Sequence, residues 1–374
     1  MSAGEHAREA ARLMRGFAER TGLSSESPAQ RYLWTDAFAV CNYLALARRT
    51  HDAAYGELAL RLVYRVHHVL GQHRPDDAHH GWLSGLAGDQ AEAHPTRGGL
   101  RIGKPLPERS PEEPLDDDLE WERDGQYFHY LTQWMHALDQ AARWTGQPRL
   151  NAWARELAET AHRAFVRRAQ GRTPRLYWKM SIDLSRPLVA SMGQHDPLDG
   201  FVACAELGAT GANPELEQAT ADFESMIARH ALATADPLGL GGLLSDACRI
   251  EQLIERGALA GDDLLDTVLG AALDGLAYYS MQIDLGRPAG RRLAFRELGL
   301  VIGLAGIQAG LCRTRAPSLA PYTKLGAAIQ AFWLDPRNRS ARTWTEHQDI
   351  NDVMLATSLV PEGYLSLQPM PLAS

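Results

Sequence analysis

The chain has 374 residues, of which 45% are hydrophobic and 22% are charged. This is the composition of an ordinary globular protein, and it excludes disordered, collagen-like and coiled-coil chains. The formal net charge of −8 excludes DNA and RNA as partners, because a nucleic-acid-binding protein needs a basic face to replace condensed counterions.

The apolar stretches and the cysteines indicate where the protein resides. Residues 1–20 carry charges every few positions and lack the apolar run of a signal peptide. No run of about 18 apolar residues occurs, so no membrane span is predicted. The four cysteines lie far apart in apolar helical contexts, which predicts reduced, buried thiols. We therefore expect a cytoplasmic protein that makes no contact with membranes.

Helical periodicity recurs along the chain, and almost no segment shows the alternating pattern of strands. Taken from the N-terminus, the helical segments alternate strictly between two kinds. The first kind is charged with one apolar stripe, and is predicted at 5–20, 53–71, 149–168, 214–232, 262–280 and 318–334. The second kind is apolar nearly all round, as in a helix surrounded by protein, and is predicted at 34–47, 126–144, 198–209, 240–255, 294–311 and 350–359.

This alternation predicts an all-α (α/α)6 toroid, in which a ring of inner helices lies inside a ring of outer helices. A helical solenoid would repeat a motif at a fixed period, and the sequence has none. Asn213 followed by Pro214 is typical of a helix start, and Gly146 of a helix end. The acid- and proline-rich segment 73–124 is predicted to be an insertion, either a lid, a partner contact or a mobile loop, within a single domain of residues 1–374.

In such a toroid, all connections from an outer helix to the next inner helix lie at one end of the ring. These connections are rich in aromatic, carboxylate and imidazole groups, whereas the opposite connections are short and chemically plain. Aromatic rings pack on sugar faces and the polar groups bond to hydroxyls, so we predict a carbohydrate site at this end. The residues expected to bind substrate are Trp34, Asp36, Trp82, Arg123, Gln126, Tyr127, Trp178, Lys179, Arg292, Trp344 and Asp349.

Three short segments carry a family resemblance: Trp34-Thr-Asp36, Asp124-Gly-Gln-Tyr127 and Gln194-His-Asp-Pro-Leu-Asp199. Together with the helical alternation, they resemble the six-hairpin glycosidase superfamily, which includes unsaturated glucuronyl hydrolases and N-acylglucosamine 2-epimerases. The resemblance covers the whole chain in architecture. It implies an (α/α)6 toroid and a carbohydrate-active enzyme.

A glycoside hydrolase is the favoured reading. Glycosidic cleavage needs one carboxylic acid that protonates the leaving group and one carboxylate that activates water or attacks the sugar. Hydrolases of this superfamily place aspartates near the starts of inner helices, which implies Asp124 with Asp196 or Asp199 as the catalytic groups. Each of them also occupies a position where aspartate commonly caps a helix, so a structural role stays open.

Two other functions stay open. An epimerase or isomerase would use His195 and His347 to remove and return a proton beside a carbonyl, since histidine titrates near neutral pH. A non-catalytic sugar-binding or scaffold protein would instead pair all its carboxylates with amides and arginines. We expect no cofactor and no metal, because adjacent pairs such as His79 and His80 do not converge on one ion. The expected partner is a small-molecule or oligosaccharide substrate, and homo-oligomerisation is left open.

Overall fold

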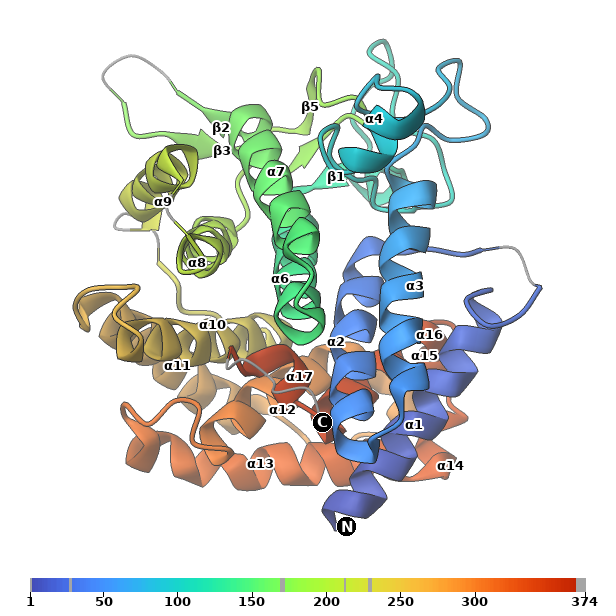
Figure 1. Cartoon of the computed structure of the whole chain (residues 1–374). Coiled ribbons are helices and arrows are strands. Elements are labelled where there is room, and N and C mark those ends of the chain that lie inside the picture. Colours follow the sequence, from blue (N-terminus) through green and yellow to red (C-terminus); the bar gives the residue numbers. More distant parts are fainter. Residues whose placement is uncertain (1, 27–28, 169–171, 212, 228–230, 368–374) are drawn as a thin grey trace. The chain divides into compact units, whose positions relative to one another are not determined.

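The computed structural model describes residues 2–26, 29–168, 172–211, 213–227 and 231–367. Figure 1 shows the helices and short strands of the chain, coloured from the N-terminus to the C-terminus. The chain divides into two compact units, each built from discontinuous segments. The terminal unit comprises Met1–Ala18, Cys41–Gly56 and Ala231–Ser374. The central unit comprises Glu19–Val40 and Glu57–His230. Helices α2 and α3 each begin in one unit and end in the other, and the prediction of a single domain stays a prediction.

The twelve predicted helices are confirmed. Those predicted to be charged on one side are α1 (Ala3–Arg20), α3 (Ala53–Leu70), α7 (Pro148–Phe165), α9 (Pro214–Ile227), α11 (Asp263–Gln282) and α13 (Ala316–Leu334). Those predicted to be shielded are α2 (Leu33–Thr50), α6 (Phe128–Thr145), α8 (Asp196–Gly208), α10 (Pro237–Glu255), α12 (Ala294–Gln308) and α16 (Gln348–Leu359). The helix predicted at 214–232 is described as helical up to Ile227; residues 228–230 lie outside the described residues, and residues 231 and 232 are not helical.

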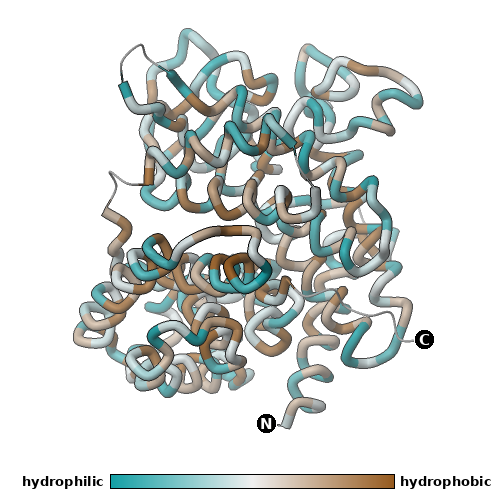
Figure 2. The backbone as a smooth tube through the Cα atoms, turned by 60° about the vertical axis from the view of Figure 1, so that its left-hand side comes forward, coloured by the Kyte–Doolittle hydropathy of each residue, from teal (hydrophilic) through white to brown (hydrophobic). Residues whose placement is uncertain are grey.

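The two kinds of helix differ in burial as their patterns predicted. Nearly every position of α10 from Leu240 to Leu253 is buried, apart from Gly242, whereas α11 buries only one stripe that includes Leu265, Val268 and Leu276. Figure 2 shows hydrophobic residues recurring along the helical segments of the chain. Burying one apolar stripe per outer helix and most faces of an inner helix is what holds such layers together.

In the terminal unit, α12 packs against α10, α13 and α16. The approach of α10 and α12 requires glycine, because a Cβ at Gly241 would lie 2.1 Å from the carbonyl oxygen of Gly299. Asp236 caps α10 by accepting a hydrogen bond from the Gly239 amide at 2.9 Å. Short helices complete the unit: α14 (Pro336–Arg339), α15 (Arg342–Thr345), α17 (Glu362–Leu365) and a 3-10 turn at Ala289–Arg291.

In the central unit, α6 packs against α7 and α8, and α9 packs against α7 and α8. The predicted helix boundaries are confirmed here. Gly146 ends α6 in the left-handed conformation, with φ of 66°. The Asn213 side chain accepts a hydrogen bond from the Glu215 amide at 2.9 Å at the start of α9. The insertion 73–124 adds two short helices, α4 (Gly88–Ala93) and α5 (Asp117–Glu120).

Short strands, which the sequence did not predict, also lie in the central unit. Strands β1 (Gln126–Tyr127), β4 (Lys179–Met180) and β5 (Pro187–Val189) form an antiparallel sheet in the order β1-β4-β5. A second pair joins β2 (Val166–Arg167) to β3 (Arg175–Leu176). Strands of two or three residues are too short to show an alternating pattern.

The state of the cysteines and the absence of a membrane span were both predicted from apolar segments of the sequence. All four cysteines are buried and unpaired by disulfides. No helix in the described part of the chain combines the length and the hydropathy that crossing a bilayer requires.

Candidate active site

The β1–β4 pairing places two aromatic side chains at the start of α6. Tyr127 in β1 lies opposite Lys179 in β4, and the Phe128 amide donates to the carbonyl of Trp178 at 3.3 Å. The Trp178 amide donates to the carbonyl of Ser191 at 2.8 Å. The backbone around Trp178 is therefore held from both sides.

Five rings gather where this sheet meets α6, and we call Trp121, Tyr127, His129, Tyr130 and Trp178 the aromatic cluster. Tyr127 lies 5.0 Å from Trp178 and 5.4 Å from His129, measured between ring centroids. The rings of His129 and Trp178 are nearly parallel, with an interplanar angle of 9°. Trp121 is 50% exposed, and Trp178, His129 and Tyr130 are half-buried. The cluster thus leaves apolar ring surface accessible to a ligand.

His129 in the first turn of α6 faces Asp196 in the first turn of α8. His129 Nδ1 lies 3.8 Å from Asp196 Oδ1, and Nδ1 has no hydrogen-bond partner among the described residues. The Gly193 amide donates to Asp196 Oδ2 at 3.2 Å. Two neighbouring helices therefore bring an imidazole and a carboxyl group together at their N-terminal ends.

The protonation states of this pair follow from burial. Burial raises the pKa of Asp196 to about 7, against the lowering effect of the Gly193 amide. Burial lowers the pKa of His129 to about 4. Near neutral pH, Asp196 is therefore partly protonated and His129 is uncharged, so the pair holds both a proton donor and a proton acceptor.

Asp124 has a different environment from Asp196. Its fully buried carboxylate accepts from Arg101 at 2.5 Å and from Arg74 at 3.3 Å. The amides of Gly103 and Gly125 also donate to it, at 3.0 and 3.1 Å. These bonds tie the insertion to the start of β1, which is the pattern of a structural anchor. The catalytic role predicted for Asp124 stays a prediction.

Three predicted substrate-binding residues around β1 and β4 are bonded within the protein. The Lys179 ammonium donates to the carboxylate and the carbonyl of Glu120, both at 2.8 Å. It also lies 5.3 Å from the Tyr127 ring centroid. The Gln126 amide donates to the carbonyls of Gly98 and Ile182. Arg123 pairs with Glu113 at 3.0 Å.

Three further residues of the central unit that were predicted to bind substrate, Trp34, Asp36 and Trp82, contact other protein groups. Trp34 is buried and packs on Phe38, with ring centroids 4.5 Å apart. Asp36 accepts from Arg31 and from the Tyr32 amide. Trp82 is half-buried beside His68. The substrate-binding roles predicted for these three residues stay predictions.

The predicted residues His195 and Asp199 flank Asp196 in sequence. His195 is the half-buried residue at the start of α8, and its carbonyl accepts from the Asp199 amide at 3.0 Å. Asp199 is half-buried in the first turn of the same helix. The structure thus places both carboxyl groups, Asp196 and Asp199, in one helical turn.

The other predicted residues belong to the terminal unit. Arg292 pairs with Glu297 at 2.7 Å and covers the Phe332 ring at 3.9 Å from its centroid. Trp344 is buried against Trp333. His347 is exposed beside Phe295, and Asp349 is half-buried. Their predicted roles in a common site stay predictions.

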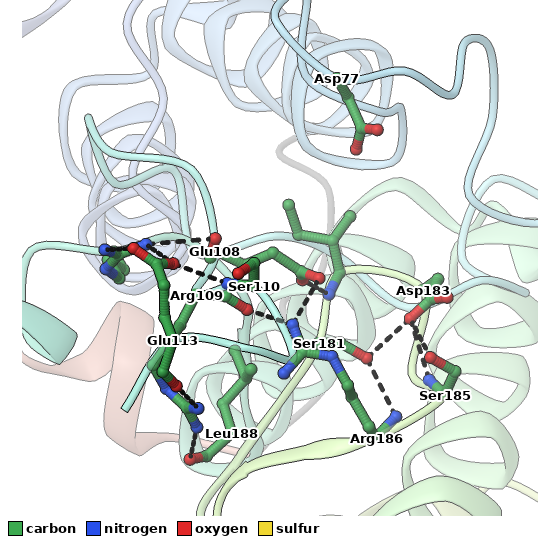
Figure 3. A network of polar contacts seen from close by, with 12 residues as sticks. Asp77, Glu108, Arg109, Ser110, Glu113, Ser181, Asp183, Ser185, Arg186 and Leu188 are labelled. Carbon is green, nitrogen blue, oxygen red and sulfur yellow. Dashed lines mark hydrogen bonds and ion pairs between the residues drawn. The ribbon is translucent and has the colours of Figure 1, made fainter. Parts of the chain in front are cut away.

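A polar network braces the β4–β5 hairpin from the insertion (Figure 3). The Ile182 amide donates to the carboxylate of Glu108 at 2.5 Å. Arg186 donates to Glu108 and to the carbonyl of Arg109. Arg109 in turn donates to the carbonyl of Leu188 at 2.9 Å. The hairpin that carries Trp178 near its first strand is therefore fixed to the insertion.

One group of described residues has the composition of a metal site: His73, Asp77 and His79, whose ligand atoms all lie within 4.8 Å of one another. The expectation of no metal was based on adjacent histidine pairs such as His79 and His80. This group instead joins His73 and Asp77, four positions apart, to His79 across a turn.

The sequence matches no protein-family model and no curated protein. Solved structures resemble the chain over most of its length. An α-mannanase of glycoside hydrolase family 76 from Bacteroides thetaiotaomicron is 8% identical and has a TM-score of 0.57, over 97% of this chain and 96% of its own. A D-mannose isomerase is 11% identical, with a TM-score of 0.54 over 88% of this chain and 84% of its own. A cellobiose 2-epimerase from Spirochaeta thermophila is 13% identical, with a TM-score of 0.50 over 87% and 86%.

The chain shares the helical-hairpin fold of these solved structures. The (α/α)6 toroid predicted from helical alternation is therefore confirmed. At identities of 8–13% the likeness extends to the fold, since one fold hosts many activities.

Sequence reasoning within this six-hairpin fold missed His129. The residue lies two positions after Tyr127, at the start of an inner helix. The other candidates were predicted because they lie at the starts of inner helices. The feature that distinguishes His129 is its approach to Asp196, which depends on the packing of α6 against α8 and leaves no pattern in the sequence. The buried pair of His136 and Glu206, with Nδ1 and Oε1 2.9 Å apart, was also missed. It joins α6 to α8, the two helices that carry His129 and Asp196.

Proposed function

We propose that this protein is a carbohydrate-active enzyme and, more narrowly, a glycoside hydrolase with Asp196 as its general acid. The observation that carries the proposal is the pair of His129 and Asp196 beside a partly exposed aromatic cluster. The structural neighbours named as a mannanase, a mannose isomerase and a cellobiose epimerase support a sugar substrate.

In this mechanism Asp196 protonates the glycosidic oxygen. A carboxylic acid with a pKa of about 7 is still partly protonated at neutral pH and is a strong enough acid to donate. Asp199, in the same turn of α8, is the candidate second carboxylate that activates water or attacks the sugar. The ionised Asp196 then regains its proton from solvent, while His129, with a pKa of about 4, stays uncharged near neutral pH.

The aromatic cluster holds the sugar in this mechanism. Trp121 and Trp178 present partly exposed rings whose centroids are 4.9 Å apart. Sugar C–H faces pack on such surfaces, and this contact positions the glycosidic bond against the carboxyl group.

A second candidate function is a sugar epimerase or isomerase, and one observation favours it. The uncharged imidazole of His129, with Nδ1 unbonded among the described residues, is suited to take a proton from the carbon beside a carbonyl. The sequence had suggested His195 and His347 for this reaction, and His129 joins His195 as a candidate within the central unit.

The experiment offers the protein a panel of mannose- and glucose-containing oligosaccharides and free aldoses in deuterated buffer. A hydrolase releases new reducing ends, whereas an epimerase or isomerase incorporates deuterium at the carbon beside the carbonyl without cleaving a bond. Asp196→Asn is expected to lose at least about 100-fold in turnover in the first case. Full activity of Asp196→Asn, or no binding of any sugar by the wild type, would overturn the proposal.

A further inference from the structure

The segment that follows α3 is a closed loop. The His73 amide donates to the carbonyl of Gly81 at 2.9 Å, and the Leu83 amide donates to the carbonyl of Gly71 at 2.9 Å. An antiparallel bridge joins Gln72 to Trp82 between these bonds. The residues within the loop, including the three potential ligands, are therefore held on one short stem.

Inside this loop, two imidazoles converge on one carboxylate. Asp77 Oδ2 lies 3.4 Å from His73 Nδ1, and Asp77 Oδ1 lies 3.2 Å from His79 Nδ1. The two histidine rings lie 5.4 Å apart, between centroids. Ligand atoms bonded to zinc at about 2.0–2.1 Å in a tetrahedron are separated by about 3.3 Å. The two separations between imidazole and carboxylate are close to that value, and all three ligand atoms lie within 4.8 Å of one another.

We propose that His73, Asp77 and His79 form a binding site for a divalent transition-metal ion, with Zn²⁺ as the expected occupant. Two imidazoles and one carboxylate are ligands that zinc accepts, whereas calcium and magnesium prefer sets made of oxygen atoms. Three protein ligands leave the fourth position of a tetrahedral site to water.

The charge of the group suits a cation. The carboxylate of Asp77 supplies a negative charge to the group, and it accepts a hydrogen bond from the His79 amide at 2.9 Å. The nearby guanidinium of Arg74 is already bonded to Asp76 at 2.7 Å and to the carbonyl of Lys104 at 2.7 Å.

The exposure of the three residues gives the ion an entry path. His79 is 77% exposed in its side chain, whereas His73 is 13% and Asp77 is 22% exposed. The two less exposed ligands are held in place, and the third closes over the ion from solvent. Binding would fasten the loop from which Arg74 reaches the carboxylate of Asp124.

The test uses the full chain without an affinity tag, stripped with a chelator and titrated with ZnCl₂ in a calorimeter. We expect one ion per chain, and a rise in melting temperature with zinc. His79→Ala and Asp77→Asn should each weaken binding by more than about tenfold, because losing a ligand costs at least as much as losing a ligand's hydrogen-bond partner. His80→Ala is the matched control, since His80 is exposed in the same loop and lies outside the group.

Two outcomes would overturn the proposal. One is the absence of stoichiometric binding to the wild type. The other is an equal loss of affinity in His80→Ala and His79→Ala, which would mean diffuse binding to a histidine-rich loop. Because His79 is largely exposed, its variant is expected to fold even if Asp77→Asn does not. Cobalt substitution provides a second readout, since a four-coordinate site gives an intense visible spectrum that His79→Ala should abolish.

Discussion

Gly193 lies against the carboxyl group of Asp196 so closely that a Cβ at position 193 would be 2.4 Å from Oδ1. No real Cβ makes so short a contact, so any larger residue displaces the carboxyl group. The turn before α8 thus fixes the group proposed as the general acid by leaving room for it and by donating an amide hydrogen bond to it.

Gly193→Ala is therefore expected to reduce turnover by more than about tenfold, because small displacements of a catalytic group cost rate steeply. The free energy of unfolding should fall by about 1–3 kcal/mol, the usual effect of overpacking. Gly208→Ala is the matched control, since a Cβ there meets no atom within 4 Å. Steady-state kinetics and urea unfolding measure both effects. Normal turnover in Gly193→Ala would show that the position of Asp196 does not matter for activity.

The pair of His129 and Asp196 predicts two opposite pH dependences of stability. The pKa of Asp196 rises from 3.8 to about 7 on folding, so the native state binds more protons and the free energy of unfolding falls as pH rises from about 4 to about 7. The pKa of His129 falls from 6.5 to about 4, so the unfolded state binds more protons and stability rises from about pH 4 to about pH 6.5.

Single substitutions should separate these slopes. In Asp196→Asn the histidine slope remains, so the free energy of unfolding should rise more steeply with pH than in the wild type. In His129→Gln the aspartate slope remains, and stability should fall with pH. Each unit of pKa shift corresponds to about 1.4 kcal/mol. Urea unfolding across this range measures the slopes, and identical pH profiles for the two variants would contradict the assignment.

Trp121→Ala should weaken sugar binding by about tenfold while leaving the melting temperature nearly unchanged, because half of its side chain surface is already exposed. Binding is measured by calorimetry with the sugar that the protein turns over. Tyr278→Ala is the matched control, since Tyr278 is 51% exposed in the terminal unit, outside the cluster. An equal loss of affinity in both variants would rule out a specific role for the aromatic cluster.

Asp124→Ala is expected to destabilise the protein by about 3–5 kcal/mol, because it leaves Arg101 without its buried partner. Differential scanning calorimetry measures the change. The alternative from sequence, a catalytic Asp124, predicts that turnover collapses in Asp124→Asn while the melting temperature stays near that of the wild type. The two measurements together distinguish an anchor from an acid.

The helical framework was predictable because the spacing of apolar residues in a long helix indicates which of its faces are buried. The one-sided stripe of α11 and the all-round burial of α10 are such cases. Strand β1 was not predictable, because its two residues pair with β4 more than fifty positions away and carry no period of their own.

The site was only partly predictable for a related reason. Asp196 was predicted because it begins a shielded helix. Both Asp196 and Asp124 are buried, but nothing in the sequence shows that only Asp124 is paired with arginine. The difference depends on Arg101, 23 positions away in the insertion. His129 is a candidate site residue only because the packing of α6 against α8 brings its ring close to Asp196.

The discontinuous make-up of the terminal unit has a consequence for biosynthesis. Asn42 donates to the carbonyl of Val353 at 3.0 Å, and Arg49 pairs with Glu362. These partners leave the ribosome more than three hundred residues apart. These residues of the second half of α2 therefore lack their C-terminal partners until nearly the whole chain has been translated. Nascent chains of this protein are expected to need chaperone protection for most of their synthesis.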